Sequence, residues 1–398
     1  MKTLQNNKHS QNKFAAAFFA AALSVVPVSA ATLSIDVPKA ALSDGSVILK
    51  NKNGKIAEFK ASASAQIQYV YADAGHARSR NGFILRRSDI SLAAKVDDRW
   101  SGAVAFEFDS KSAGGPINNG YVSYAYVAYT NDSGTLKAGL SKPHFLQEEI
   151  TSFLKLPAIE RSIVSNYLAS ANADVRGLAS SHIGLFWDGK ILPASNTPLN
   201  YGVSLTNAVV QDFDTRSNAL SVTGYIETEI DFSDETKTVF GISAVGNFGN
   251  DGNPPGVFGG PATNAGTVYG IEPYVKISGG GLNVLLDGYY VNGDNASRVS
   301  RTLAGIALVS YRLENGIEPV LRFTRFNTKT VNGGIHAGYA ANVPATNKHS
   351  NAATYYVGAN YYVNDYVKIS AGYEYGHYFG TTKSEDSNTF RTQIQIGF

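Results

Sequence analysis

Polar and apolar residues alternate along most of the chain, in short segments separated by turn-forming residues. An early segment, 61–71, sets alanines, Ile67 and two tyrosines against serines and glutamines, and the last segment, 391–398, reads RTQIQIGF. Alternation with period two is typical of β-strands that have one apolar and one polar face. About sixteen such segments follow one another, mostly near the 9–11 residues that a tilted membrane strand needs.

The links between these segments are alternately short and long. The short links are 97–99, 131–134, 231–236, 278–281, 314–316 and 363–365, with a somewhat longer one at 189–198. The long links are 72–81, 110–119, 144–180, 207–217, 249–267, 292–300, 327–351 and 379–387. A barrel with an even number of strands has tight turns at one end and long loops at the other. The sequence therefore predicts an all-β fold, a transmembrane antiparallel β-barrel of about sixteen strands, which is wide enough to hold a water-filled channel.

The N-terminal residues have the pattern of a secretory signal peptide. Three lysines precede an apolar run over 14–28, and Val28-Ser29-Ala30 supplies small residues at a cleavage position. We expect a signal peptide at 1–30, a polar lead-in at 31–55 and the barrel at 56–398. An uncleaved anchor is the alternative, although the apolar run is shorter than a membrane-spanning helix requires.

Composition supports an exported barrel. The chain has 23 Tyr, 20 Phe and 39 Gly, no Cys, and only 17% charged residues. Loss of 1–30 would remove three lysines and no acids, which lowers the Lys and Arg count from 34 to 31 against 32 acids. This balance argues against a nucleic-acid partner, and the missing Cys excludes thiolate metal sites and cysteine nucleophiles.

Several stretches resemble the phosphate-selective porin O and P family. They are FILRRSDISLAAKV, LKAGLSKPHFLQEEITSFLKLPAIERSIVSNYL, IEPVLRFTRFN, YYVGANYYVNDYVKISAGYEYG and FRTQIQIGF. The second stretch is the most specific of them. The resemblance implies an outer-membrane homotrimer with one channel per subunit for small hydrophilic solutes, with anions and possibly phosphate preferred. It also implies that the loop 144–180 folds inward to narrow the pore. The family's clustered lysines have no evident match here, so a non-selective diffusion pore is the alternative.

Charged residues of this loop and of the strand walls are the candidates for setting selectivity, because fields are strong where a pore is narrow. The candidates at the constriction are Lys142, Glu148, Glu149, Lys155, Glu160, Arg161 and Arg176. Alternation places the following on the lumen wall: Arg87, Asp89, Lys137, Lys276, Arg312, Glu318, Arg322, Lys368, Glu374 and Arg391. Cations outnumber anions on the wall, which favours a mild anion preference; paired charges on a generic wet wall are the alternative. Arg86 has the opposite parity, so we expect it at a membrane interface or at the rim.

Other classes of function have little support in the sequence. There is no Gly-x-Ser-x-Gly, HExxH or P-loop motif, and the histidines are scattered, so we expect neither an enzyme nor a metal or cofactor site. A structural or adhesive barrel with partner-binding loops is the other alternative. The final aromatic, Phe398, resembles the recognition signal for the barrel-assembly machinery, which would be a partner together with outer-membrane lipid.

Overall fold

The computed structural model describes residues 46–49, 58–74, 79–109, 119–169, 178–191, 197–207, 220–233, 235–248, 267–295, 298–329, 335, 348–380 and 383–398. Residues 37–398 form one compact unit. The signal peptide expected at 1–30 and most of the expected lead-in lie outside the described residues.

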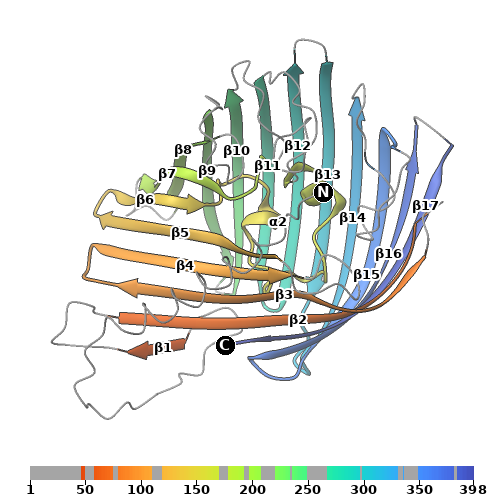
Figure 1. Cartoon of the computed structure of the whole chain (residues 1–398), viewed down its shortest axis with the longest axis horizontal. Coiled ribbons are helices and arrows are strands. Elements are labelled where there is room, and N and C mark those ends of the chain that lie inside the picture. The colour runs from red at the N-terminus through yellow and green to blue at the C-terminus, as the bar shows by residue number, and fades with distance from the viewer. Residues whose placement is uncertain are drawn as a thin grey trace, which may run out of the picture. The chain divides into compact units, whose positions relative to one another are not determined.

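The described part of the chain contains 17 strands in one antiparallel sheet (Figure 1). The strands are β1 (Ser46–Leu49), β2 (Glu58–Ala74), β3 (Arg80–Lys95), β4 (Trp100–Asp109), β5 (Asn119–Asn131), β6 (Gly134–Ser141), β7 (His182–Ile191), β8 (Leu199–Asn207), β9 (Leu220–Ser233), β10 (Thr236–Phe248), β11 (Thr267–Gly279), β12 (Leu282–Asn295), β13 (Arg298–Tyr311), β14 (Ile317–Lys329), β15 (Asn351–Tyr362), β16 (Val367–Phe379) and β17 (Glu385–Gly397). All of them except β1 form a closed ring, in which each strand pairs with its neighbours in sequence and β17 pairs with β2. The predicted sixteen-stranded barrel is confirmed.

The ring closes between the first and last of these strands. Gln66 of β2 donates a hydrogen bond to Gln395 of β17 at 2.8 Å, and the backbone groups of Ala63 and Phe398 bond each other in both directions, at 2.8 and 3.0 Å. The short strand β1 pairs with the start of β2, beyond the end of β17. Phe398 is therefore part of the seam.

The two faces of the ring differ as the alternation predicts. On β17, Ile394 and Phe390 are 56% and 41% exposed, whereas Arg391 and Gln393 are 4% and 3% exposed. Large apolar side chains occupy the exposed face all around the ring, and most polar side chains occupy the other face, together with some buried apolar ones. An exposed apolar face suits contact with lipid. Several inward polar residues are more deeply buried than a wet wall requires, because the chain segment after β6 covers them.

Strand boundaries differ from the sequence prediction at the loop ends. The link expected at 292–300 is mostly strand, since β12 runs to Asn295 and β13 starts at Arg298. Many strands have 13 or 14 residues. These strands extend past the apolar band that faces outward. Their ends consist mostly of polar residues, so the sequence shows no hydrophobic signal there.

One β-bulge corrects the expected position of Arg86. The register between β2 and β3 shifts between Gln66 and Ile67, whose partners are Arg87 and Leu85. Arg86 is the extra residue, so it does not keep the outward parity of its neighbours. Its guanidinium instead bonds Glu160 on the inner side, and the prediction of an interfacial or rim position was wrong.

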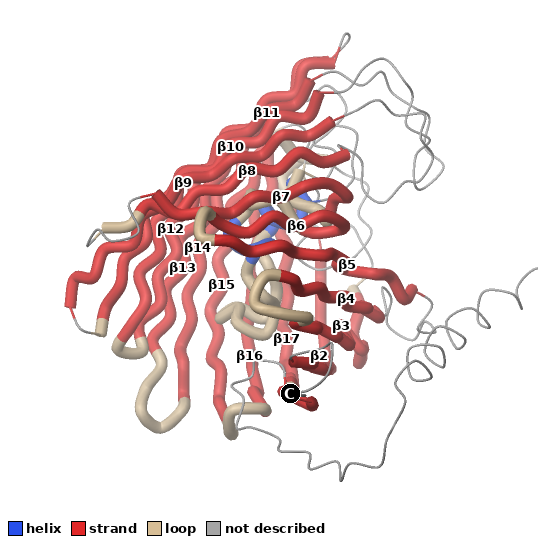
Figure 2. Tube along the Cα trace, turned by 90° about the vertical axis from the view of Figure 1, so that its left-hand side faces the viewer, coloured by secondary structure: helices blue, strands red, loops and turns tan. Residues whose placement is uncertain are grey.

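The segment between β6 and β7 carries two short helices, α2 (Gln147–Ile150) and α3 (Ile163–Ala169). Its apolar side chains, including Phe145, Ile163 and Tyr167, form a buried cluster with strand residues such as Phe326 and Val291. Figure 2 shows these helices in blue between strands that are far apart in the sequence. No helix in the described part of the chain is long and apolar enough to cross a membrane.

Candidate functional site

Glu160 ties the segment after β6 to the wall formed by β2 and β3. Its carboxylate accepts hydrogen bonds from Arg86 Nε at 2.7 Å, from Arg87 at 3.1 Å and from Gln68 Nε2 at 2.8 Å. Burial alone would raise the pKa of Glu160, but Arg86, Arg87 and Arg391 lower it well below its ordinary value. Glu160 is therefore ionised at neutral pH and compensates two neighbouring guanidinium groups.

A second ion network joins the same segment to β14, β16 and β17. Arg322 contacts Glu148 at 3.1 Å and Glu374 at 3.2 Å, and it donates a hydrogen bond to the backbone oxygen of Glu160 at 2.7 Å. Arg391 lies 3.8 Å from the other oxygen of Glu374. The side chains of Arg322, Glu148 and Glu374 are only 1–2% exposed. Their charges compensate each other in a buried network and hold the segment in place.

Glu272 of β11 fixes the start of α2. Its two carboxylate oxygens accept hydrogen bonds from the backbone N–H groups of Leu146 and Gln147, at 2.8 and 2.7 Å. Leu146 has a φ of 68°, the only positive φ at a non-glycine residue in the described chain. An L-residue adopts this conformation at a cost of about 1–3 kcal/mol. The buried carboxylate therefore stabilises a strained turn in which both amides point at one acceptor.

The middle of the segment is held by its backbone oxygens. Lys368 donates to the oxygens of Leu154 and Leu156, at 3.3 and 3.1 Å, and Asn360 donates to Pro157 at 2.9 Å. Lys368 is only 2% exposed. This lysine therefore serves as an anchor for the segment, although the sequence placed it among the candidates for a wet wall.

Three lysines that lie beside carboxylates keep more contact with solvent than Lys368 does. Lys142 lies 2.7 Å from Glu149, and their side chains are 34% and 9% exposed. Lys276 of β11 lies 3.5 Å from Glu227, with 35% and 16% exposed. Burial lowers the pKa of Lys142, and the nearby Glu149 opposes this shift. In both pairs the lysine side chain is more exposed than the carboxylate side chain.

The third pair behaves differently. Lys137 of β6 lies 3.3 Å from Asp188 of β7, and the two side chains are similarly exposed, at 32% and 38%. Its ammonium also lies 5.8 Å from the centre of the Tyr126 ring. The pair therefore presents both signs of charge to solvent.

An aromatic cluster around His144 lies near Lys137 and Lys276, whose charges both act on its imidazole. The His144 ring stacks on Tyr225 with centroids 3.6 Å apart, and the Tyr274 ring is 6.3 Å away. Burial lowers the pKa of His144 to about 4; Glu227 partly opposes this shift, and Lys276 adds to it. The imidazole is therefore neutral at pH 7. The tyrosine hydroxyls donate to acids, Tyr225 to Asp188 at 3.1 Å and Tyr274 to Glu227 at 2.8 Å.

The remaining predicted residues take varied positions. Lys155 is exposed on the segment, and Arg161 bonds the backbone oxygen of Glu148 at 2.8 Å and the carboxylate of Glu149 at 3.3 Å. Asp89 is half-buried, and Ser64 donates to it at 3.4 Å. Arg312 is exposed over the Tyr362 ring, 3.9 Å from its centre. Arg176 lies outside the described residues.

Sequence reasoning missed several contributors to this site, among them Glu272, Tyr225 and Tyr274. All three lie on the inward parity of their strands, but the pattern showed only a polar or aromatic residue in a poorly matched region. These residues have their roles because they contact the segment after β6. The alternation of polar and apolar residues carries no information on that contact. Among the described residues, no group of three or more His, Asp or Glu is arranged to hold a metal ion.

Comparison with known proteins supports a porin. The family model described as phosphate-selective porin O and P matches residues 59–188, so the resemblance seen in the sequence is confirmed over this part of the chain. None of the curated proteins compared with the chain matches it significantly.

Solved structures show the same fold at low identity. The outer membrane channel DcaP of Acinetobacter baumannii is 12% identical with a TM-score of 0.58, over 88% of this chain and 99% of that one. An anion-selective porin from Comamonas acidovorans is 10% identical with a TM-score of 0.58, over 85% and 99%. The trimer form of OmpT, an outer membrane protein of Vibrio cholerae, is 12% identical with a TM-score of 0.52, over 85% and 99%.

Proposed function

We propose that this porin-fold chain forms a water-filled channel in the outer membrane, through which small hydrophilic solutes diffuse passively, with anions preferred over cations. The family match over 59–188 and the closed ring of strands support the channel. A barrel of this size leaves an aqueous passage unless something fills it. The role is passage of solutes rather than catalysis.

The exposure of the lysine–carboxylate pairs carries the proposed anion preference. At Lys142–Glu149 and Lys276–Glu227 the lysine side chain is two or more times as exposed as the acid side chain. A mobile ion in the passage therefore meets the positive end of each pair first. An ammonium about 5 Å from an anion in water contributes about 0.8 kcal/mol, which the more distant carboxylate partly offsets, so removing the ammonium should change the local anion concentration about fourfold. The arginines that are most buried are compensated, so they add little to this field.

The segment after β6 supplies the proposed constriction. It contacts inward-facing side chains of β2, β3, β11, β14, β15, β16 and β17. If the segment fills the side of the barrel formed by these strands, the passage lies between the segment and the strands that carry Lys137 and Tyr225. The predicted roles of Lys142, Glu149, Lys155 and Arg161 at this narrow part remain proposals, as does the loop's inward fold.

Assembly and export follow the same proposal. A trimer form is known for OmpT, which shares the fold, and we extend that arrangement to this chain. Export through cleavage after Ala30 and recognition of Phe398 by the assembly machinery complete the pathway to the outer membrane.

The test is the reversal potential of the purified protein in a planar bilayer under a KCl gradient. We expect a potential that favours chloride, and Lys142→Gln with Lys276→Gln should lower the chloride-to-potassium permeability ratio about fourfold or more. Lys237→Gln is the matched control, because this exposed lysine pairs with Glu229 at the tight-turn end. A wild-type potential near zero would leave a non-selective diffusion pore. Block by added phosphate would assign the anion class.

A further inference from the structure

Two basic residues face outward side by side at the loop end of the ring. Arg301 of β13 and Lys329 of β14 are direct register partners, and both are exposed. Like charges directly opposite each other on neighbouring strands destabilise a sheet. Neither residue makes an ion pair with another described residue. Arg301 and Lys329, the outer basic pair, therefore form an outward positive site without a protein counter-charge in the described part of the chain.

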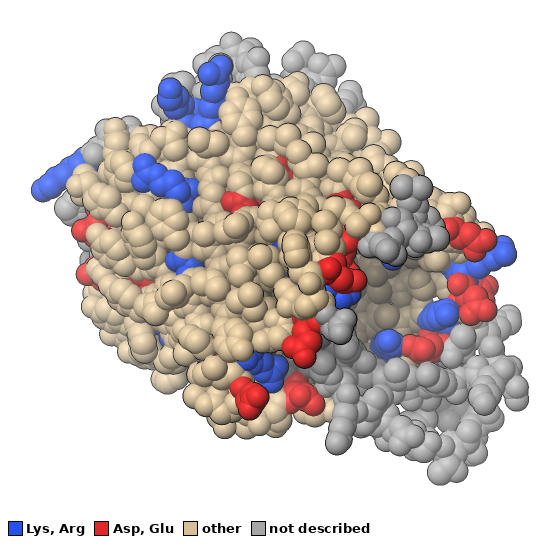
Figure 3. Space-filling model, turned by 180° about the vertical axis from the view of Figure 1, so that it is seen from behind, with Lys and Arg blue, Asp and Glu red and all other residues tan. Residues whose placement is uncertain are grey.

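The surrounding surface is mostly uncharged. Figure 3 shows blue side chains near the upper left, where β13 and β14 end, on a face that is otherwise largely tan. A third outward cation, Arg325, is the partner of Gly305 and four residues below Lys329. Its guanidinium lies over the Phe379 ring, 4.9 Å from the ring centre. The aromatic contact leaves its charge facing outward.

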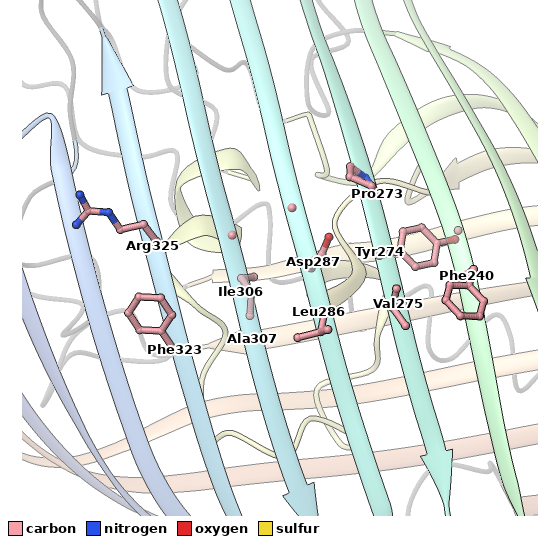
Figure 4. A pocket seen from close by; sticks show the side chains of 13 residues that line it. Phe240, Pro273, Tyr274, Val275, Leu286, Asp287, Ile306, Ala307, Phe323 and Arg325 are labelled. Carbon is pink, nitrogen blue, oxygen red and sulfur yellow. The ribbon is translucent and has the colours of Figure 1, made fainter. Parts of the chain in front are cut away.

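A mostly apolar depression, which Arg325 also lines, lies below the outer basic pair on the same face. Its floor is the glycine trough, made of Pro273, Gly288 and Gly305 on three neighbouring strands, and Phe240 and Phe323 stand beside it (Figure 4). Its volume is about 630 Å³. A Cβ built on Gly305 would come no closer than 3.5 Å to another atom, and one on Gly288 no closer than 3.7 Å. Side chains of the protein therefore do not fill the trough.

The spacing between the two features matches a lipid. Gly305 and Arg301 are four residues apart on β13, which is about 13 Å along a strand. That distance is close to the thickness of one hydrocarbon leaflet, about 15 Å. Loops of such barrels face outside and tight turns face the periplasm, so the outer basic pair lies at headgroup level and the trough lies among the acyl chains of the outer leaflet.

We propose that this face binds a phosphorylated, multiply acylated lipid of the outer leaflet. A phosphate between Arg301 and Lys329 would supply the missing counter-charge, whereas Arg325, the register partner of Gly305, lies at the level of the trough. An acyl chain would lie over Leu303 into the glycine trough. A second copy of this chain is the less suitable occupant, because it would bury two like charges that no described residue neutralises.

The experiment uses the protein refolded in micelles of a neutral detergent and a diphosphorylated, multiply acylated glucosamine lipid as the probe, with bound lipid counted by native mass spectrometry. Arg301→Gln with Lys329→Gln should weaken binding about thirtyfold, as two basic residues near a charged headgroup provide. Gly288→Leu with Gly305→Leu should also weaken it, because leucines would occupy the trough without backbone clashes. Lys60→Gln with Lys95→Gln, at the tight-turn end, is the control and should bind like the wild type.

Two further probes identify the source of the phosphate chemistry. Inorganic phosphate should not compete at concentrations that leave the lipid bound, and a neutral lipid with the same chains should bind weakly. Equal binding by all variants would overturn the proposal. So would loss of an oligomer in lipid-free micelles on Arg301→Gln with Lys329→Gln, since the surface would then be a contact between copies. Channel conductance of the variants should not change, which separates this proposal from the proposed channel function.

Discussion

Replacing Glu160 by glutamine tests whether one carboxylate holds the segment after β6 against the wall. Glu160→Gln keeps the shape and one acceptor oxygen, but it removes the charge that faces Arg86 and Arg87, at 2.7 and 3.1 Å. These side chains are 17% and 5% exposed, and that of Glu160 is 6% exposed. Breaking a buried pair in this way costs about 3–5 kcal/mol, because a charge is left without compensation. We expect a loss near 3 kcal/mol.

The assay has two readouts in the same micelle-refolded protein. The midpoint of guanidinium unfolding, followed by near-ultraviolet circular dichroism, should fall, and single-channel conductance should rise or fluctuate as the segment loosens. Glu229→Gln is the matched control. It removes a carboxylate from a pair with Lys237 that is 41% and 56% exposed, and an exposed pair contributes only about 0–1 kcal/mol.

A second substitution distinguishes lost charge balance from general damage. Adding Arg86→Gln to Glu160→Gln removes one of the uncompensated cations, so part of the lost stability should return. The reasoning is refuted if Glu160→Gln costs less than about 1 kcal/mol, or if the double variant is less stable by the sum of both single losses.

Three further predictions follow from the same contacts. Glu160 has a pKa below its ordinary value, so its stabilising effect is complete above about pH 4.3 and is lost as pH falls through the lowered pKa. The unfolding midpoint of the wild type should therefore decline below about pH 4. Glu160→Gln should lack that part of the decline. Glu272→Gln should cost about 1–3 kcal/mol and increase amide exchange at Leu146, measured by mass spectrometry; unchanged exchange there would contradict its proposed hold on the turn. Deleting Phe398 removes two backbone hydrogen bonds to Ala63 and should slow refolding into lipid vesicles, monitored by heat-modifiable gel mobility, whereas Phe398→Tyr should refold at the wild-type rate.

Alternation and link lengths were enough to predict the ring and its two faces. Ile394 and Arg391 lie on the faces that their parity indicated, because a period of two is a property of the strand backbone itself. The bulge at Arg86 broke this rule by one residue, and no feature of RRSD distinguishes it from a regular strand.

The site was less predictable because it depends on contacts between distant parts of the chain. The sequence named Glu148, Glu160 and Arg322 as pore candidates, but it did not show that they would compensate each other in a buried network. It also did not show which lysines keep their solvent contact. Burial of a polar wall depends on where the segment after β6 lies, and that position is set by partners such as Glu272, 126 residues from Leu146.

The seam between β2 and β17 also limits how the ring can form. Gln66 and Gln395, which bond each other across it, are 329 residues apart, whereas every other pair of ring strands is adjacent in the sequence. Hairpins can therefore form early from local contacts, but the closing pair must bring together two ends of a long chain, and such distant pairing is slow. Until it forms, β2 and β17 each present a row of unpaired N–H and C=O groups, which lipid does not satisfy. Closure and membrane insertion should thus be one coupled event, with the open ring as the species at greatest risk of aggregation.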